Sequence, residues 1–281
     1  MKTTIKPVVV GIVDKQPSVL RFAMREAIRA GAPLRVVHAV SMPVQVAEFN
    51  VGIDAMSAAR EGGQKLLDDA KHFIDKEAES PPVSYVLTTE PAIQALERES
   101  ATARVLIIGA DDLPWYDRML GGAVAPHVTR HASCAVVVVP EISYPPTATG
   151  GVVVTLDGDT SASGPLGFAF EQADARDRTL QVLHAAPPAT LTSDVEDIRV
   201  NIGAILAGWN ESFPDVRVIP TFIFETPEQA IVDATENAEL VVVGRPHNRT
   251  IAFALARPVA MQVLRRAQCP VAIVPADYQG S

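Results

Sequence analysis

Short runs of consecutive apolar residues, rich in Val and Ile, recur along the chain and alternate with longer amphipathic stretches. Because these runs are continuous rather than alternating, we expect parallel strands that helices bury on both faces. The expected strands cover residues 8–13, 34–40, 83–87, 104–109, 135–139, 151–156, 180–185, 216–222, 240–244 and 271–274. The expected helices cover residues 18–30, 53–79, 91–101, 121–132, 162–175, 191–212, 227–237 and 256–267. Such alternation predicts right-handed βαβ units and a doubly wound sheet.

The end of this pattern occurs twice. Residues 124–140, VAPHVTRHASCAVVVVP, return 135 positions later as VAMQVLRRAQCPVAIVP, residues 259–275, with nine of seventeen positions identical. The same spacing carries Gly109 onto Gly244. Chance similarity between two amphipathic helices would not keep a Cys and a strand-ending Pro in register. The chain therefore contains an internal repeat.

Upstream of that segment the spacing between the copies widens. We pair Asp14 with Asp157, 143 positions apart, and His38 with His184, 146 positions apart. Shorter loops in the second copy, around its second strand and helix, would account for the difference.

The segment between the copies, residues 142–150, is rich in Pro and small residues and has neither a helical nor a strand period. We therefore expect one domain over residues 1–141, a linker over 142–150 and a second domain over 151–281. Each half is of ordinary domain size.

Composition narrows the class of protein and its surroundings. The chain of 281 residues has 48% hydrophobic and 20% charged residues, which is typical of a well-cored globular protein. A net charge of −9 argues against nucleic-acid binding, which usually leaves a basic surface. The apolar runs are too short to span a membrane. Two Cys residues and no recognisable signal peptide favour a reducing cytoplasm.

Several fragments at corresponding places in the two copies resemble the universal stress protein family. The first strand of that family ends in Asp and a short turn, the second ends in His and a small apolar residue, and the last helix leads to Cys and a strand that ends in Pro. The matching fragments are DKQPS (14–18), DGDTS (157–161), VVHAV (36–40), VLHAA (182–186), RHASCAVVVVP (130–140) and RRAQCPVAIVP (265–275). Each fragment alone is weak evidence, but their order, repeated in both halves, is specific.

The resemblance implies an α/β fold of two tandem Rossmann-like domains of the adenine nucleotide alpha hydrolase-like type. Each would be a five-stranded parallel sheet of order 3-2-1-4-5 flanked by helices. It also implies that domains associate through their last strands, which the two halves can do within one chain and which two chains can do in a homodimer. A further protein partner is expected, but its identity is unknown.

The family's phosphate loop has Gly, two residues, Gly, nine residues, then Gly and Ser or Thr; its glycines let backbone N–H groups approach phosphates. In the first copy Gly109 and Gly122 keep the outer glycine positions, whereas Asp112 replaces the middle glycine and Ala123 the hydroxyl residue. The loop carries three carboxylates, those of Asp111, Asp112 and Asp117. Like charges a few ångströms apart cost on the order of 1 kcal/mol each. ATP is therefore disfavoured in this loop unless a metal bridges the charges.

In the second copy Gly244 is kept, His247 stands at the middle glycine position, and Arg257 and Pro258 replace Gly-Ser. This loop is basic, with Arg245, His247, Arg249 and Arg257. Its cations could hold an anion through side chains rather than through a glycine cradle, or could pair with the acidic loop of a neighbouring copy. We therefore expect ATP or another adenine nucleotide as a candidate ligand at Asp14, Gly109, Gly122, Asp157 and Gly244, on loops that have lost much of the family's pattern.

The strand-end residues allow more than one interpretation. The family places an aspartate near the nucleotide, where Asp14 and Asp157 stand, but turn and helix-capping chemistry is the interpretation we favour. For His38 and His184 we expect packing, with one ring nitrogen bonded to the backbone, because no nucleophile or carboxylate partner is recognisable.

Cys134 and Cys269 are expected to be small buried hydrophobic residues, since neither has a second Cys or a His at metal-ligand spacing. The sequence therefore gives no catalytic and no metal site. Trp115 and Tyr116 could anchor a partner, stack on a base, or fold over the cleft.

These observations favour a cytoplasmic stress-response binding or regulatory protein, not an enzyme, with degenerate ATP-binding loops in both copies. The alternative is a nucleotide-responsive switch that holds ATP or AMP in the first copy through Asp14, Gly109 and Gly122. A hydrolase on a Rossmann-like scaffold is a weaker alternative, because no nucleophile elbow, metal cluster or complete phosphate loop supports it.

Overall fold

The computed structural model of the chain describes residues 5–40, 52–110, 124–140, 150–156, 163–187, 192–245, 263–264 and 266–280. The chain divides into two compact units, Met1–Glu141 and Ile142–Ser281. The second unit's first strand begins at Gly150, the last residue of the segment expected to be the linker. The remainder of that segment lies outside the described residues.

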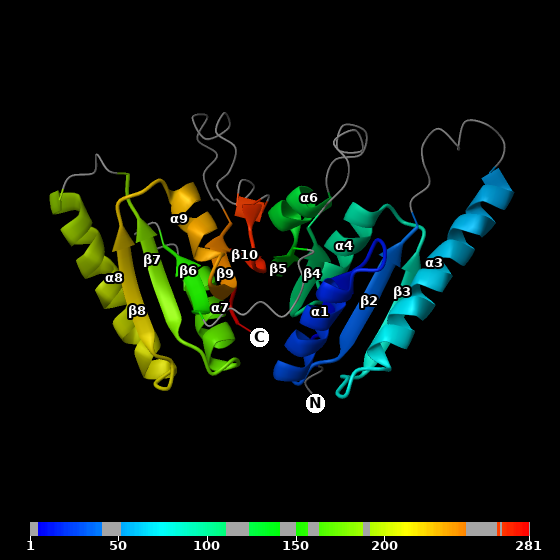
Figure 1. The fold of residues 1–281 in the computed structure, drawn as a ribbon, viewed down its shortest axis with the longest axis horizontal. Helices are drawn as coiled ribbons and strands as arrows, with labels where there is room; N and C mark the ends of the chain where they lie inside the picture. Colours follow the sequence, from blue (N-terminus) through cyan, green and yellow to red (C-terminus); the bar gives the residue numbers. More distant parts are fainter. Residues whose placement is uncertain are drawn as a thin grey trace. The chain divides into compact units, whose positions relative to one another are not determined.

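The described part of the first unit alternates strands and helices (Figure 1). Its elements are β1 (Val8–Gly11), α1 (Pro17–Arg29), β2 (Leu34–Ala39), α3 (Gly52–Ile74), β3 (Val83–Thr88), α4 (Ala92–Ser100), β4 (Val105–Gly109), α6 (Val124–His131) and β5 (Ala135–Val139). All strand pairs are parallel and the order is β3-β2-β1-β4-β5. The expected 3-2-1-4-5 sheet is confirmed.

The second unit repeats this arrangement (Figure 1). Its elements are β6 (Gly150–Thr155), α7 (Ser163–Asp174), β7 (Leu180–Ala185), α8 (Thr192–Ser212), β8 (Val218–Ile223), α9 (Pro227–Ala234), β9 (Ala238–Gly244) and β10 (Val271–Val274). The strands are again parallel, in the order β8-β7-β6-β9-β10. Most of the helix expected at 256–267 lies outside the described residues.

Helices cover both faces of each sheet, which is why the strands are continuously apolar. In the first unit α1 contacts α3, and α4 contacts α6. Right-handed crossovers place the first pair on one face and the second pair on the other. Every residue of β4 and β5 is buried, as are the Val residues of β1. The expectation of strands buried on both faces is confirmed.

The longest expected helix is shorter than the sequence pattern suggests. The pattern predicts residues 53–79, whereas α3 ends at Ile74. Beyond that point the backbone hydrogen bonds span three residues instead of four, since the N–H groups of Lys76 and Glu77 donate to the carbonyls three residues earlier. Such bonds are a common way for the last turn of a helix to close.

The repeat extends to individual hydrogen bonds. The hydroxyl of Ser100, at the end of α4, accepts a hydrogen bond of 2.9 Å from the backbone N–H of Ser133. At the same place in the second unit, the hydroxyl of Thr235 accepts one of 3.1 Å from Gln268. Both partners are separated from their counterparts by 135 positions, so the spacing found in the sequence holds for this half of each unit.

Candidate functional site

The chain order of the strands reverses between β1 and β4, and this point is where open α/β sheets bind ligands, beyond the carboxyl ends of the strands. In the first unit Gly109 is the last residue of β4 and is buried. Asp14 follows β1 and is exposed. The candidate ligand site of this unit therefore lies above the ends of these two strands.

The side chain of Gln16 lies directly above Gly109. An added Cβ on Gly109 would lie 2.4 Å from Gln16 Nε2 and 3.1 Å from its Cδ. The other end of the same carboxamide accepts a hydrogen bond of 3.4 Å from the backbone N–H of Val13, beyond β1. The Gln16 side chain thus connects the end of β1 to the end of β4 and fills the space that a side chain at position 109 would occupy, on the side of the sheet that Val19 of α1 covers.

The local sequence explains this position. Pro17 begins α1, and proline is favoured in the first turn because it has no N–H to leave unpaired. Gln16 is the N-cap residue, but its side chain makes no capping hydrogen bond. The carboxamide is therefore available to fold over the sheet. Asp14 is not the capping residue of α1, so the capping interpretation of Asp14 is wrong.

In the second unit the corresponding glycine has a different neighbour. Gly244 ends β9, and Pro165 Cγ of α7 is the nearest atom that an added Cβ would meet, at 3.2 Å. Within the described part of the chain, no other atom lies within 4 Å of that Cβ. The described residues thus place an amide above Gly109 and only a proline ring beside Gly244.

The sheet register corrects the pairing of Asp14 with Asp157. Gly11 lies opposite Val37, and Thr155 lies opposite Leu183, so the first strands of the two units are 144 positions apart. The residue that corresponds to Asp157 is therefore Val13, whose surface is 60% exposed. The sequence pairing was wrong because it aligned the two aspartates rather than the strands.

The two turns also differ in length. From Ile12 to the start of α1 there are four residues, 13–16, whereas from Leu156 to the start of α7 there are six, 157–162. The shorter turn explains why the spacing changes from 144 in the first strands to 146 in the helices and second strands. It also explains why the residue next to Pro17 reaches back over the sheet.

The two histidines occupy equivalent positions in the corrected register. His38 Nδ1 lies 2.9 Å from the carbonyl oxygen of Ile12, and His184 Nδ1 lies 2.9 Å from that of Leu156. A carbonyl oxygen only accepts, so each Nδ1 donates. The expectation of packing histidines with one nitrogen bonded to the backbone is confirmed.

The two cysteines are buried. Cys134 is 6% exposed and Cys269 is 1% exposed, and neither forms a disulfide. Burial raises the pKa of the Cys269 thiol to about 12, although a backbone hydrogen bond at Val241 acts in the opposite direction. The expectation of small buried residues is confirmed for both.

The remaining residues expected at the site lie outside the described residues. This applies to Gly122, Asp157, Asp112, Ala123, His247, Arg257, Pro258, Trp115 and Tyr116. Of the expected ligand residues, the structure describes Asp14, Gly109 and Gly244. Gln16, which sequence analysis did not single out, is the side chain closest to Gly109; its position next to the helix-starting Pro17 was the available signal.

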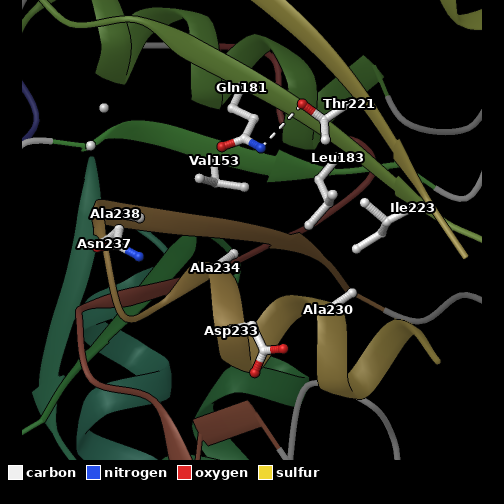
Figure 2. Close-up of a pocket in the computed structure, with 12 residues that line it drawn as sticks. Val153, Gln181, Leu183, Thr221, Ile223, Ala230, Asp233, Ala234, Asn237 and Ala238 are labelled. Atoms are coloured by element: carbon white, nitrogen blue, oxygen red, sulfur yellow. Dashed lines mark hydrogen bonds between the residues drawn. The ribbon is translucent and has the colours of Figure 1, made fainter. Parts of the chain in front are cut away.

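A cavity of about 270 Å³ lies elsewhere, in the second unit between α9 and the sheet (Figure 2). It is lined by strand residues such as Gln181, whose amide donates to the Thr221 hydroxyl at 3.1 Å, and by Ala234 of α9. It extends toward Gly150 and Ala238, at the amino ends of β6 and β9. Its lining also reaches Ile223, the last residue of β8, but does not include Gly244 at the end of β9.

The first unit has an ion pair at the equivalent place. Arg35 and Glu99 correspond to Gln181 and Ala234, and the Arg35 guanidinium lies 2.9 Å from the Glu99 carboxylate. The shorter side chains of Gln181 and Ala234 line the cavity in the second unit and form no ion pair with each other.

Two units with parallel strands in this order, each with a histidine bonded to the end of its first strand, define a tandem Rossmann-like protein. The model of the universal stress protein family matches residues 4–140 and again residues 150–275. The chain belongs to the universal stress protein family.

Similar proteins have the same two-domain length. Universal stress protein Rv2623 of Mycobacterium tuberculosis is 29% identical over 287 residues, which cover 95% of each chain. A universal stress protein of Mycolicibacterium smegmatis is 25% identical over 270 residues and 91% of each chain. A solved universal stress protein from Archaeoglobus fulgidus superposes with a TM-score of 0.71 at 16% identity and 95% coverage of both chains.

In the part of the chain that the structure describes, no helix is both long and apolar enough to cross a membrane.

Proposed function

We propose that this chain is a binding or regulatory protein of the stress response whose first unit has lost the family's adenine nucleotide site. The observation that carries this proposal is the carboxamide of Gln16 above Gly109. Phosphates in such sheets approach the backbone of this glycine and the helix that follows. The carboxamide would have to move aside if a phosphate came close to the backbone of this glycine.

Two sequence features support the same conclusion. The acidic residues Asp111, Asp112 and Asp117 follow Gly109 and disfavour a polyphosphate. Val13 stands where the second unit has Asp157, so the first strand of this unit lacks an acidic residue in register with it. An apolar side chain there offers no hydrogen bond to a ribose or a base.

The experiment is equilibrium binding of labelled ATP to the full chain, with and without Mg²⁺. We expect no saturable binding at micromolar ATP in the first unit. Gln16→Gly removes the carboxamide and therefore tests whether this group prevents ATP binding in the first unit. Lys15→Gly, in the same turn, is its control. ATP seated on the backbone of Gly109 with a Kd of about 1 μM, equal to about −8 kcal/mol, would contradict the proposal.

The second candidate is a nucleotide-responsive switch, for which the described residues favour the second unit over the first. Among the described residues, Pro165 is the one that lies close to Gly244. In the sequence, Asp157 directly follows Leu156, whose carbonyl oxygen His184 contacts. If this unit holds an adenine nucleotide, Asp157→Ala should weaken ATP binding at least about tenfold, as loss of a charged hydrogen bond does. Binding that is equal in Asp157→Ala and wild type would exclude the switch.

In either case the protein would act by association rather than by catalysis, in the cytoplasm. We propose that the last strands, β5 and β10, are the associating elements, within the chain and between two chains. Light scattering after size exclusion measures this directly. A strictly monomeric chain at all concentrations would leave only the internal contact.

A further inference from the structure

The first unit brings two histidines and a carboxylate together on its surface, away from the strand ends. His127 and His131 are one helical turn apart on α6, and Glu97 lies on the neighbouring helix α4. The Glu97 Oε1 atom is 3.2 Å from His127 Nε2 and 3.9 Å from His131 Nδ1. One nitrogen or oxygen from each residue lies within 4.8 Å of the other two.

The histidine rings are already held in an orientation that suits ligation. His131 Nδ1 lies 2.9 Å from the carbonyl oxygen of His127, so this nitrogen donates its proton and leaves Nε2 as the ligand atom. Histidines that bind metals usually donate their other ring nitrogen in this way, which fixes the tautomer. The ring centroids of the two histidines are 4.3 Å apart, so the two imidazoles lie side by side.

The neighbouring cation does not compensate Glu97. Arg98 follows it in the sequence, but its guanidinium contacts the carboxylates of Glu90 and Glu99. The polar partners of Glu97 among the described residues are the two imidazoles. His127 Nε2 is within hydrogen-bond distance of Glu97, whereas the His131 side chain has to turn to bring its Nε2 toward a cation held by the other two residues.

The fold does not require this cluster, because the second unit lacks it. At a spacing of 135 the three residues correspond to Val232, Gln262 and Arg266. These three side chains together do not provide the ligands of a metal site. Arg266 instead approaches Gln229 of α9 at 3.5 Å. The cluster is thus a property of the first unit and not of the repeated scaffold.

We propose that Glu97, His127 and His131 form a surface site for a divalent transition-metal ion, with Zn²⁺ as the ion that best fits two imidazoles and one carboxylate. Two histidines at i and i+4 on one helix face are a recurrent chelating pair, and water would complete a tetrahedral site. Ligand atoms around Zn²⁺ are about 3.3 Å apart, given bonds of about 2.0–2.1 Å. The two exposed histidines, 46% and 49% accessible, and the half-buried Glu97, 32% accessible, can rotate to close the remaining gap.

A bound ion would join α4 to α6. This matters because α6 directly follows residues 111–123, the segment that corresponds to the phosphate loop of the family. The site therefore offers the first unit a ligand chemistry that does not depend on a nucleotide.

The test is calorimetric titration of the tag-free, metal-free full chain with Zn²⁺, and with Co²⁺, whose visible spectrum reports ligand geometry. We expect one site, and we expect Glu97→Gln, His127→Gln and His131→Gln each to weaken it about tenfold or more. His72→Gln, which removes an exposed histidine of α3, is the matched control and should leave the affinity unchanged.

A second measurement separates binding from folding. Zn²⁺ should raise the unfolding temperature of the wild-type chain and of His72→Gln, but not that of the three site variants. Without metal, all variants should unfold at the wild-type temperature within a few degrees, since the replaced side chains are exposed. Equal Zn²⁺ affinity in wild type and site variants, or no binding by the wild type, would overturn the proposal.

Discussion

Among the described residues, a single glutamine distinguishes the end of β4 in the first unit from the end of β9 in the second. Gln16 has ordinary chemistry, and nothing about its residue type indicates a role. Its effect comes from its place: the turn before Pro17 is short, and the carboxamide makes no capping hydrogen bond although Gln16 is the N-cap residue of α1. It therefore bonds to Val13 and lies on Gly109.

At this scale the sequence predicted some side chains well and others poorly. The histidines and cysteines were predictable because repeated residues at the borders of apolar strands are usually packed. The position of Gln16 and the correspondence of Val13 with Asp157 were not predictable, because both depend on the length of the turn after the first strand. Aligning Asp14 with Asp157 in the sequence gives the wrong length for this turn. His127 and His131 were visible as a helical pair, but Glu97 lies thirty positions away and meets them only through the packing of α4 on α6.

Buried Cys269 should be almost inert to thiol reagents in the folded chain. With a pKa of about 12, its thiolate fraction at pH 8 is about 10⁻⁴, compared with about a quarter for an exposed thiol. In the Cys134→Ser variant, Ellman's reagent should label Cys269 about a thousandfold more slowly in buffer than in urea. Labelling of the native variant within seconds would contradict this prediction.

Among the elements, α7 and α8 of the second unit show opposite uses of glycine. A Cβ on Gly164, in the first turn of α7, would lie 2.4 Å from the carbonyl oxygen of Pro275 and 2.5 Å from that of Ala276. This glycine lets α7 approach the backbone that follows β10. Gly203 and Gly208 of α8 are exposed, with open space around them.

Two alanine substitutions should therefore have opposite signs. Gly164→Ala should destabilise the chain by about 1–3 kcal/mol, because the backbone carbonyls have to move. Gly203→Ala should stabilise it by about 0.5–1 kcal/mol, because alanine lowers the entropy of the unfolded chain and favours helix. Urea unfolding followed by the fluorescence of Trp209, which packs on Gly167 of α7, measures both. A destabilised Gly203→Ala variant would show that α8 is constrained in a way its exposed surface does not indicate.

The elements themselves were largely predictable. The strands at 135–139, 180–185 and 271–274 coincide with the expected ranges, because continuous Val and Ile runs bounded by polar residues leave little choice of position. The helix ends were less certain, as the earlier end of α3 shows, because mixed polar sequence continues past the point where the packing stops.

On the scale of the whole molecule, each unit has its own complete sheet and its own core. All five strands of a unit find parallel partners within that unit. The duplication was evident in the sequence because the last helix and strand recur at a constant spacing. The features in which the two units differ were harder to predict, because they lie in turns and in exposed side chains.

We expect residues 1–141 and residues 142–281 to fold when produced separately. Each should give the circular dichroism of an α/β domain and a cooperative thermal transition, since a core of this size sustains an independent domain. If the last strands associate as proposed, the separate first half should dimerise through β5. A half that lacks a cooperative transition would show that the units depend on each other for stability.

The two-residue difference between the turns after β1 and β6 also bears on how such tandem proteins diverge. Shortening a surface turn costs little stability, because loop-closure entropy changes slowly with length, yet here it brings a new side chain onto the mouth of one sheet. A difference of two residues in one turn is therefore enough to place a different side chain beside the last residue of β4, although the order of the strands is the same in both units.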